Sequence, residues 1–146
     1  MIAKKFEELI FWQKARELTK IVYGYSKNGA FQKDFELKDQ IRRSAVSVMA
    51  NIAEGFGRGG NKELIQFLFI AKGSLSETQS HLYVARDQEY VDEKKFQAAY
   101  DKAEETAKLI NAFIRSVEQV SKKGLTVTQS EQKRRTEVER RTQNFI

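Results

Sequence analysis

Hydrophobic positions recur every three or four residues over four long stretches of the chain, which is the spacing of one helical face. Short glycine-containing segments separate the first three stretches, and the absence of proline leaves nothing to interrupt long helices. Helices are predicted at residues 5–26, 34–54, 61–89 and 92–120. Because the connections are short, consecutive helices must run in opposite directions. We therefore expect an all-α protein, an antiparallel up-and-down four-helix bundle with a basic C-terminal tail.

Side chains near the expected helix ends support these boundaries. Asn61 and Asp92 are suitable N-caps for the third and fourth helices, since their side chains can accept hydrogen bonds from the first free backbone N–H groups. Gly73 is the one breaker inside the third helix, and with Ser74 and Ser76 it removes side-chain bulk. We expect another helix to approach closely at these small residues.

The first three predicted helices carry more apolar side chains than one bundle face can bury. Phe11, Trp12 and Ile21 widen the apolar stripe of the first helix, and residues 64–71 of the third are apolar nearly all the way round. Exposed apolar area on a water-soluble helix favours a partner, and a second copy is the simplest one. We predict a homo-oligomer, with a monomer of unusually apolar helices as the alternative.

Length and charge suggest a bundle domain over residues 1–120 and a basic tail, flexible or helical, over residues 121–146. The net charge of the chain is +6. The tail contributes much of it, because it holds seven Lys and Arg against three Glu. An excess of positive charge is compatible with nucleic-acid binding, although most of that excess lies outside the bundle.

Several function classes have little support in the composition. The chain has no cysteine, which excludes disulfides and cysteine metal sites, and His81 is its one histidine. No stretch approaches a membrane span, and the N-terminus lacks the apolar core of a signal peptide. Residues 57–62 lack the spacing of a phosphate-loop motif. We expect a cytoplasmic protein that is not an enzyme and uses no metal or cofactor.

One polar line runs along the second predicted helix at spacings of four, four and three, so its members share a stripe. The polar line consists of Arg43, Ser47, Asn51 and Glu54. In one interpretation it is a structural network, in which Arg43 pairs with Glu77 while Asn51 and Glu54 cap backbone groups near residues 55–60. In the other, the arginine holds phosphate and Glu54 acts as a base. We favour the structural interpretation, since a carboxylate without a nucleophile or metal is weak support for chemistry.

Basic side chains beside the apolar stripes and in the tail are the candidates for nucleic-acid contacts. The turn at residues 57–62 combines flexible glycines, two cations and a helix start, which together favour an anion. Trp12 could stack on a base, but a core or interface role is the stronger interpretation. The candidate nucleic-acid-binding residues are Arg42, Arg58, Lys62, Lys14, Arg16, Lys72, Lys133, Arg134, Arg135, Arg140 and Arg141.

Three sequence blocks together resemble a known family. They are residues 6–15 (FEELIFWQKA), residues 40–58 (QIRRSAVSVMANIAEGFGR) and residues 67–77, which contain the GSLSE sequence. In this order and spacing they resemble the 23S ribosomal RNA intervening-sequence proteins over residues 5–120. One departure is visible, because many members carry a proline before the position of Asn51, where this chain has Val-Met-Ala. The second helix is therefore expected to be straighter here.

The resemblance implies a small bacterial helical bundle, often assembled as a homopentamer, with no established enzymatic activity. The family is similar to the accessory variability protein of diversity-generating retroelements, a basic pentamer that associates with nucleic acid and a reverse transcriptase. We therefore expect weak binding of RNA or DNA by an oligomer. The alternative is a protein-interaction scaffold that recruits another protein, such as a reverse transcriptase.

Overall fold

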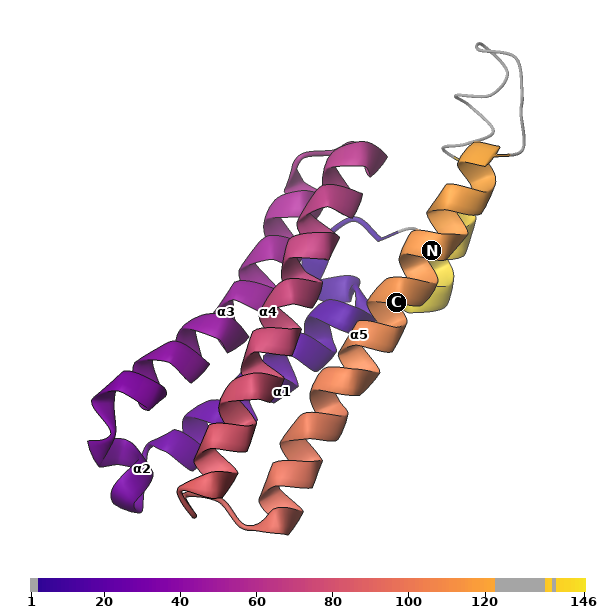
Figure 1. Cartoon of the computed structure of the whole chain (residues 1–146). Helices are drawn as coiled ribbons and strands as arrows, with labels where there is room; N and C mark the ends of the chain where they lie inside the picture. Colours follow the sequence, from indigo (N-terminus) through magenta and orange to yellow (C-terminus); the bar gives the residue numbers. More distant parts are fainter. Residues whose placement is uncertain (1–2, 123–135, 138) are drawn as a thin grey trace.

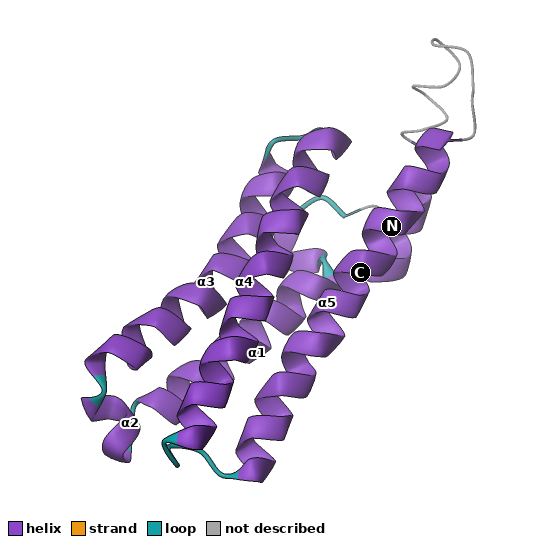
Figure 2. Cartoon of the chain, viewed as in Figure 1, coloured by secondary structure: helices purple, strands orange, loops and turns teal. Residues whose placement is uncertain are grey.

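The structure, a computed structural model of the chain, describes residues 3–122, 136–137 and 139–146. Within these ranges the regular structure is entirely helical (Figure 2). The elements are η1 (Phe6–Glu8), α1 (Ile10–Ser26), α2 (Gly29–Lys33), α3 (Phe35–Gly57), α4 (Asn61–Asp87), α5 (Glu93–Lys122) and η2 (Gln143–Phe145). Residues 136–137 and 139–142 are also α-helical.

The four long helices α1, α3, α4 and α5 pack antiparallel, which confirms the predicted bundle (Figure 1). Helix α1 contacts α3 and α5, and α4 contacts the same two helices from the other side. Each long helix therefore has two neighbours in the bundle. None of the helices in the described ranges has the length and hydropathy of a membrane-spanning segment.

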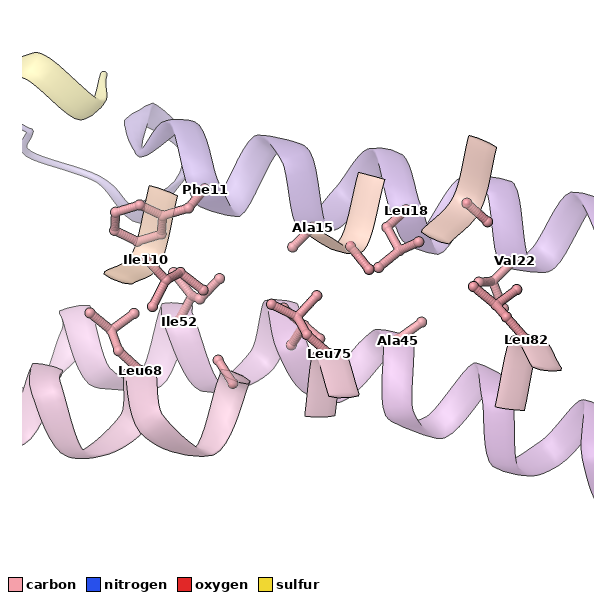
Figure 3. Close-up of a cluster of buried hydrophobic side chains, with 14 of the residues drawn as sticks. Phe11, Ala15, Leu18, Val22, Ala45, Ile52, Leu68, Leu75, Leu82 and Ile110 are labelled. Atoms are coloured by element: carbon pink, nitrogen blue, oxygen red, sulfur yellow. The ribbon is translucent and has the colours of Figure 1, made fainter. Parts of the chain in front are cut away.

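The core lies between the four long helices, each of which contributes buried side chains at steps of three and four (Figure 3). Residues such as Leu18, Ile52, Leu75 and Ile110 are completely buried. Burying a side chain of this size contributes about 1.5–3 kcal/mol relative to leaving it exposed. Packing of the apolar stripes, rather than helix propensity, therefore holds the fold together.

The first predicted helix is divided at Leu9, whose backbone is extended, with φ −71° and ψ 125°. Leu9 and Phe11 are both fully buried. Two residues that are two positions apart point to different sides of a helix, so an uninterrupted helix could not bury both. The extended residue solves this conflict and ends the short helix η1 before α1 begins.

A further helix, α2, occupies part of the segment predicted as a turn. It begins at Gly29, which has a φ of +61°. The helix carries Phe31 into the core, where its ring stacks on Tyr90 at 5.2 Å between centroids. The turn predicted at residues 27–30 is present at residues 27–28, but the short helix that follows it was not predicted.

The helix caps agree with the prediction at one helix and differ at another. Asp92 caps α5 as expected, with its Oδ1 accepting a hydrogen bond from the Lys95 backbone N–H at 2.8 Å. The prediction for Asn61 was wrong, since α4 begins at Asn61 itself and Gly60 takes the N-cap position without a side-chain hydrogen bond. Asp34 caps α3 through the N–H of Leu37 and also accepts a hydrogen bond from the Tyr90 hydroxyl at 2.9 Å.

Helices α3 and α4 approach each other closely at Gly55 of α3, whereas Gly73, where a close approach was predicted, is exposed. A methyl group added at Gly55 would lie 2.7 Å from Cβ of Phe67 and 3.4 Å from Cα of Leu64. No atom lies within 4 Å of the corresponding position at Gly73, which is on the exposed side of α4. Of the three small residues in α4, only Ser74 faces α3.

The C-terminal residues pack back against the bundle at the C-terminal end of α5 (Figure 1). The Phe145 ring contacts the rings of Phe113 and Phe11, with centroids 5.4 and 6.3 Å apart. Arg141 reaches α5 through a hydrogen bond from its Nη1 to Oγ of Ser116 at 3.2 Å. This segment therefore covers one end of the interface between α1 and α5.

Candidate functional site

Helices α3 and α4 share a hydrogen-bonded polar seam, formed by Ser44, Ser47, Asn51, Ser74 and Thr78. The hydroxyls of Ser47 and Ser74 lie 2.9 Å apart, and Asn51 donates to Oγ and the carbonyl of Ser47 at 3.0 and 2.8 Å. One turn further along, the hydroxyls of Thr78 and Ser44 lie 2.8 Å apart. Every buried side-chain nitrogen and oxygen in the described residues has a partner. The polar seam thus fixes the register of the two helices.

The predicted network was only partly correct. Ser47 and Asn51 belong to the polar seam, but Asn51 bonds within α3 and does not cap the turn after it. Arg43 does not reach Glu77; it pairs with Asp39 at 2.8 Å. Both of these side chains are largely exposed, and an exposed pair of this kind contributes little to stability. Glu77 makes no hydrogen bond or ion pair with the part of the chain that the structure describes.

The turn predicted to bind phosphate has one of its two cations engaged. Arg58 pairs with Glu54 at 2.9 Å, and its guanidinium lies over the Phe67 ring, 5.5 Å from the centroid. Glu54, the carboxylate of the catalytic interpretation, is therefore engaged in an exposed ion pair. Lys62 is exposed and forms no ion pair within the described ranges.

Lys14 belongs to a group of two lysines and two glutamates that joins α1 to α5. It lies 3.3 Å from Glu105 and 3.6 Å from Glu17. Lys102 bonds Glu17 at 2.9 Å, which raises the pKa of Lys102 and lowers the pKa of Glu17. The four charges offset one another, so Lys14 is poorly placed to attract phosphate.

Two cations of the tail, Arg140 and Arg141, are also paired within the chain. Glu137 accepts hydrogen bonds from Arg140 at 2.6 Å and from Arg141 at 2.7 Å. These two arginines hold the pKa of the Glu137 carboxyl down to about 2. The other predicted tail contacts, Lys133, Arg134 and Arg135, lie outside the described residues.

This cluster predicts a measurable pH dependence. A lowered folded-state pKa adds stability above the ordinary carboxyl pKa of 4.5, and that stability is lost as pH falls toward about 2. We expect Glu137→Gln to lower the thermal midpoint at neutral pH and to approach the unmodified chain near pH 2, where about half of Glu137 is protonated and most of its stabilising effect is lost. Thermal denaturation of both proteins across this range measures the difference. A difference that persists undiminished at the acidic end would contradict the ion-pair explanation.

Cations and aromatic rings alternate along the side of α1 that meets α3. Arg42 lies 4.4 Å from the centroid of the Tyr23 ring, and Arg16 lies 5.8 Å from that of Trp12. Lys38 lies over Phe35 at 4.8 Å. We call these six residues the α1/α3 cationic face. The helix contact itself is marked by a hydrogen bond from the Thr19 hydroxyl to the Ala45 carbonyl.

No carboxylate of α1 lies on this face. Glu17 is the only acidic residue of α1, and its contacts with Lys14 and Lys102 place it on the opposite side, toward α5. On α3, Asp39 is engaged by Arg43. Three cations therefore remain beside exposed ring surface without an opposing ion pair in the described residues.

The sequence prediction found only part of this face. Arg16 and Arg42 were among the predicted contacts, whereas Tyr23, Lys38 and Phe35 were not. Spacing could have revealed Tyr23, since Trp12, Arg16 and Tyr23 follow one another at intervals of four and seven on one stripe. Trp12 itself is partly buried and packs edge-on against Phe6 at 5.1 Å.

The apolar surface left exposed is mainly on α4, not on α1. Phe11 is completely buried, and Trp12 and Ile21 are partly buried within the chain. Phe69 and Ile70 are each 51% exposed, and Lys72 lies over the Phe69 ring at 5.1 Å. The large apolar residues that remain exposed on α3 and α4 are Phe35, Val46, Phe69, Ile70, Tyr83 and Val84.

His81, the one histidine of the chain, lies on α4. His81 is partly buried, which lowers its pKa, while nearby Glu77 opposes that shift. No group of three or more His, Asp and Glu side chains in the described residues is placed to hold a metal ion.

Comparison with known proteins agrees with this description. The family model of the 23S rRNA-intervening sequence protein matches residues 7–112. No curated protein matches the chain. A crystal structure from Bacteroides thetaiotaomicron, described as a protein of unknown function from the S23 ribosomal protein family, is similar to this one with a TM-score of 0.65 and 29% identity. The match covers 72% of this chain and 98% of the other. The chain therefore belongs to the 23S rRNA-intervening sequence protein family.

Proposed function

We propose that this protein is a non-enzymatic, homo-oligomeric helical bundle that binds RNA or DNA weakly through exposed cations. The observation that carries the proposal is the α1/α3 cationic face, where Arg16, Lys38 and Arg42 have no ion-pair partner in the described residues. Lys and Arg that neutralise phosphates release counterions, which drives association without sequence preference. Lys62 and Lys72 add further positive charge on α4.

Oligomerisation would strengthen such binding. Three cations on one copy give only weak affinity, but each added copy brings the same face again, and linked sites act at high effective concentration. The exposed Phe69 and Ile70 support α4 as the contact between copies, because apolar side chains of this size gain by leaving water. By resemblance to its family, a pentamer is the favoured assembly.

Titration of fluorescent RNA and DNA oligonucleotides at low and moderate salt tests the binding proposal. With about four phosphates neutralised per bound strand, raising the salt fourfold should weaken binding roughly 50-fold. A triple variant, Arg16→Gln with Lys38→Gln and Arg42→Gln, should reduce both the affinity and the slope. A matched control, Lys94→Gln with Lys108→Gln and Arg115→Gln, removes the same charge from the exposed side of α5. Absence of binding at low salt would reject the proposal.

The second candidate is a scaffold that recruits another protein, and the exposed apolar residues of α4 are the observation that favours it. Light scattering distinguishes the two roles of this surface. A mass that is a multiple of 16.9 kDa and falls for Ile70→Glu assigns the surface to self-association. A monomer at high concentration would reject the oligomer and leave the α4 surface available to a different protein.

A further inference from the structure

We propose that the α1/α3 cationic face binds single-stranded nucleic acid, with an unpaired base stacking on Tyr23 and the adjacent phosphate bound by Arg42. This inference rests on the proposed function and specifies its ligand. It depends on three properties of the face: a fixed guanidinium, a partly exposed ring in contact with it, and the position of Glu17, the carboxylate of α1, on the other side of that helix.

The guanidinium of Arg42 is held in place from one side only. Its Nε donates a hydrogen bond to Oγ of Ser26 at 2.8 Å. Ser26 is completely buried, and its hydroxyl is itself fixed by the Val22 carbonyl at 2.7 Å. The two terminal nitrogens of Arg42 make no hydrogen bond within the described residues. A guanidinium oriented through Nε presents those nitrogens as a fork that matches two phosphate oxygens.

The Arg42 guanidinium lies over one face of the Tyr23 ring, so a stacking base would use the other face. Arg42 is centred 4.4 Å from the ring, and Tyr23 is still 41% exposed. A base stacked on the accessible ring surface would place its own phosphate within reach of the same arginine. Ring stacking of this kind tolerates any base, because every base has a π-face.

The face continues in both directions from this pair. Arg16 is seven residues before Tyr23, or about 10 Å along the helix axis, and Lys38 is one turn before Arg42 on α3. Since Glu17 faces α5, no carboxylate of α1 interrupts the stretch. The cations are thus spaced along a line that a short extended strand can follow.

Duplex nucleic acid should bind this face less tightly than a single strand does. Paired bases are already stacked on their neighbours and cannot reach the Tyr23 ring unless they are first unpaired. Arg42 and Arg16 would still attract the phosphates. A preference for unpaired strands therefore separates stacking from simple charge attraction.

The chain offers a matched control at the opposite side of the bundle. Tyr83 of α4 is 43% exposed and also carries an arginine over its ring, with Arg86 at 4.9 Å. There, however, Arg86 is paired with Glu93 at 3.4 Å, and the ring packs against Phe96 at 4.9 Å. The exposure and the residue types match those of Tyr23 and Arg42, but the charge is offset.

The experiment compares a short oligothymidylate with an abasic oligonucleotide of equal length and charge, and with a duplex, by fluorescence anisotropy on the full chain. We expect the oligothymidylate to bind about five- to tenfold more tightly than the abasic strand. Tyr23→Leu, which keeps apolar volume but removes the π-face, should abolish that difference and leave abasic binding unchanged. Tyr23→Phe should retain the difference, and Tyr83→Leu should behave as the unmodified chain does.

The results test base stacking on Tyr23 separately from the proposed electrostatic binding of nucleic acid. Equal binding of the oligothymidylate and the abasic strand by the unmodified protein would overturn base stacking and leave electrostatic binding intact. An equal loss in Tyr23→Leu and Tyr83→Leu would place the site elsewhere and also overturn this inference. Failure of all three oligonucleotides to bind at low salt would remove the proposed function itself. Circular dichroism of the variants confirms that each comparison is made on folded protein.

Discussion

Phe11→Ala should lower the free energy of unfolding by about 3–5 kcal/mol, the largest effect we expect from a single substitution. Phe11 is completely buried, and its ring lies 5.5 Å from that of Phe113. It also contacts Phe145, so its removal opens a cavity where α1, α5 and the C-terminal residues meet. Urea denaturation followed by circular dichroism measures the change.

Phe35→Ala is the matched control for that substitution. Phe35 is 71% exposed at the start of α3, so truncating it removes little buried area. A change within about 0.5 kcal/mol is expected. Similar losses for the two phenylalanines would mean that the burial described for Phe11 is incorrect.

Gly55→Ala is expected to destabilise the protein by about 1–3 kcal/mol, although alanine is normally the better helix former. The added methyl group would lie 2.7 Å from Cβ of Phe67, which is anchored to the α4 backbone. Rotation of a side chain cannot relieve a contact with Cβ, so the two helices must move apart. The Cα of Leu64, also on α4, would lie 3.4 Å from the same methyl group.

Gly73→Ala provides a control of opposite sign. This glycine lies inside α4, with no atom within 4 Å of the added methyl group. Alanine there should raise the free energy of unfolding by about 0.5–1 kcal/mol. Urea midpoints for both variants test the pair together, and stabilisation by Gly55→Ala would show that α3 and α4 are not in close contact at that position.

Hydrophobic spacing was sufficient to predict the bundle because each long helix buries a stripe at steps of three and four. It was insufficient at Leu9 and Phe31, where burial depends on a break in the helix or on a structured turn. Periodicity reports which residues share a face of one element. It does not report where the chain must bend so that residues outside the stripe can reach the core.

The site was harder to predict for a related reason. Spacing correctly predicts that Arg43, Ser47, Asn51 and Glu54 share one side of a helix. Which residues of α4 lie opposite them depends on how α3 and α4 are each rotated about their own axes, and spacing does not give that rotation. That rotation brings Thr78 to Ser44 and leaves Glu77 on the surface. Tyr23 was missed because an aromatic residue beside an apolar stripe resembles a core residue until its 41% exposure is known.

The hydroxyl and amide contacts between α3 and α4 also limit how the molecule can change shape. A slide of one helix past the other by a turn, about 5.4 Å, would break the hydroxyl contacts that join Ser47 to Ser74 and Ser44 to Thr78, and each such hydrogen bond contributes about 0.5–1.5 kcal/mol. These two helices must therefore travel together as a rigid pair. We therefore expect any rearrangement during assembly or ligand binding to move α1 and α5 relative to α3 and α4.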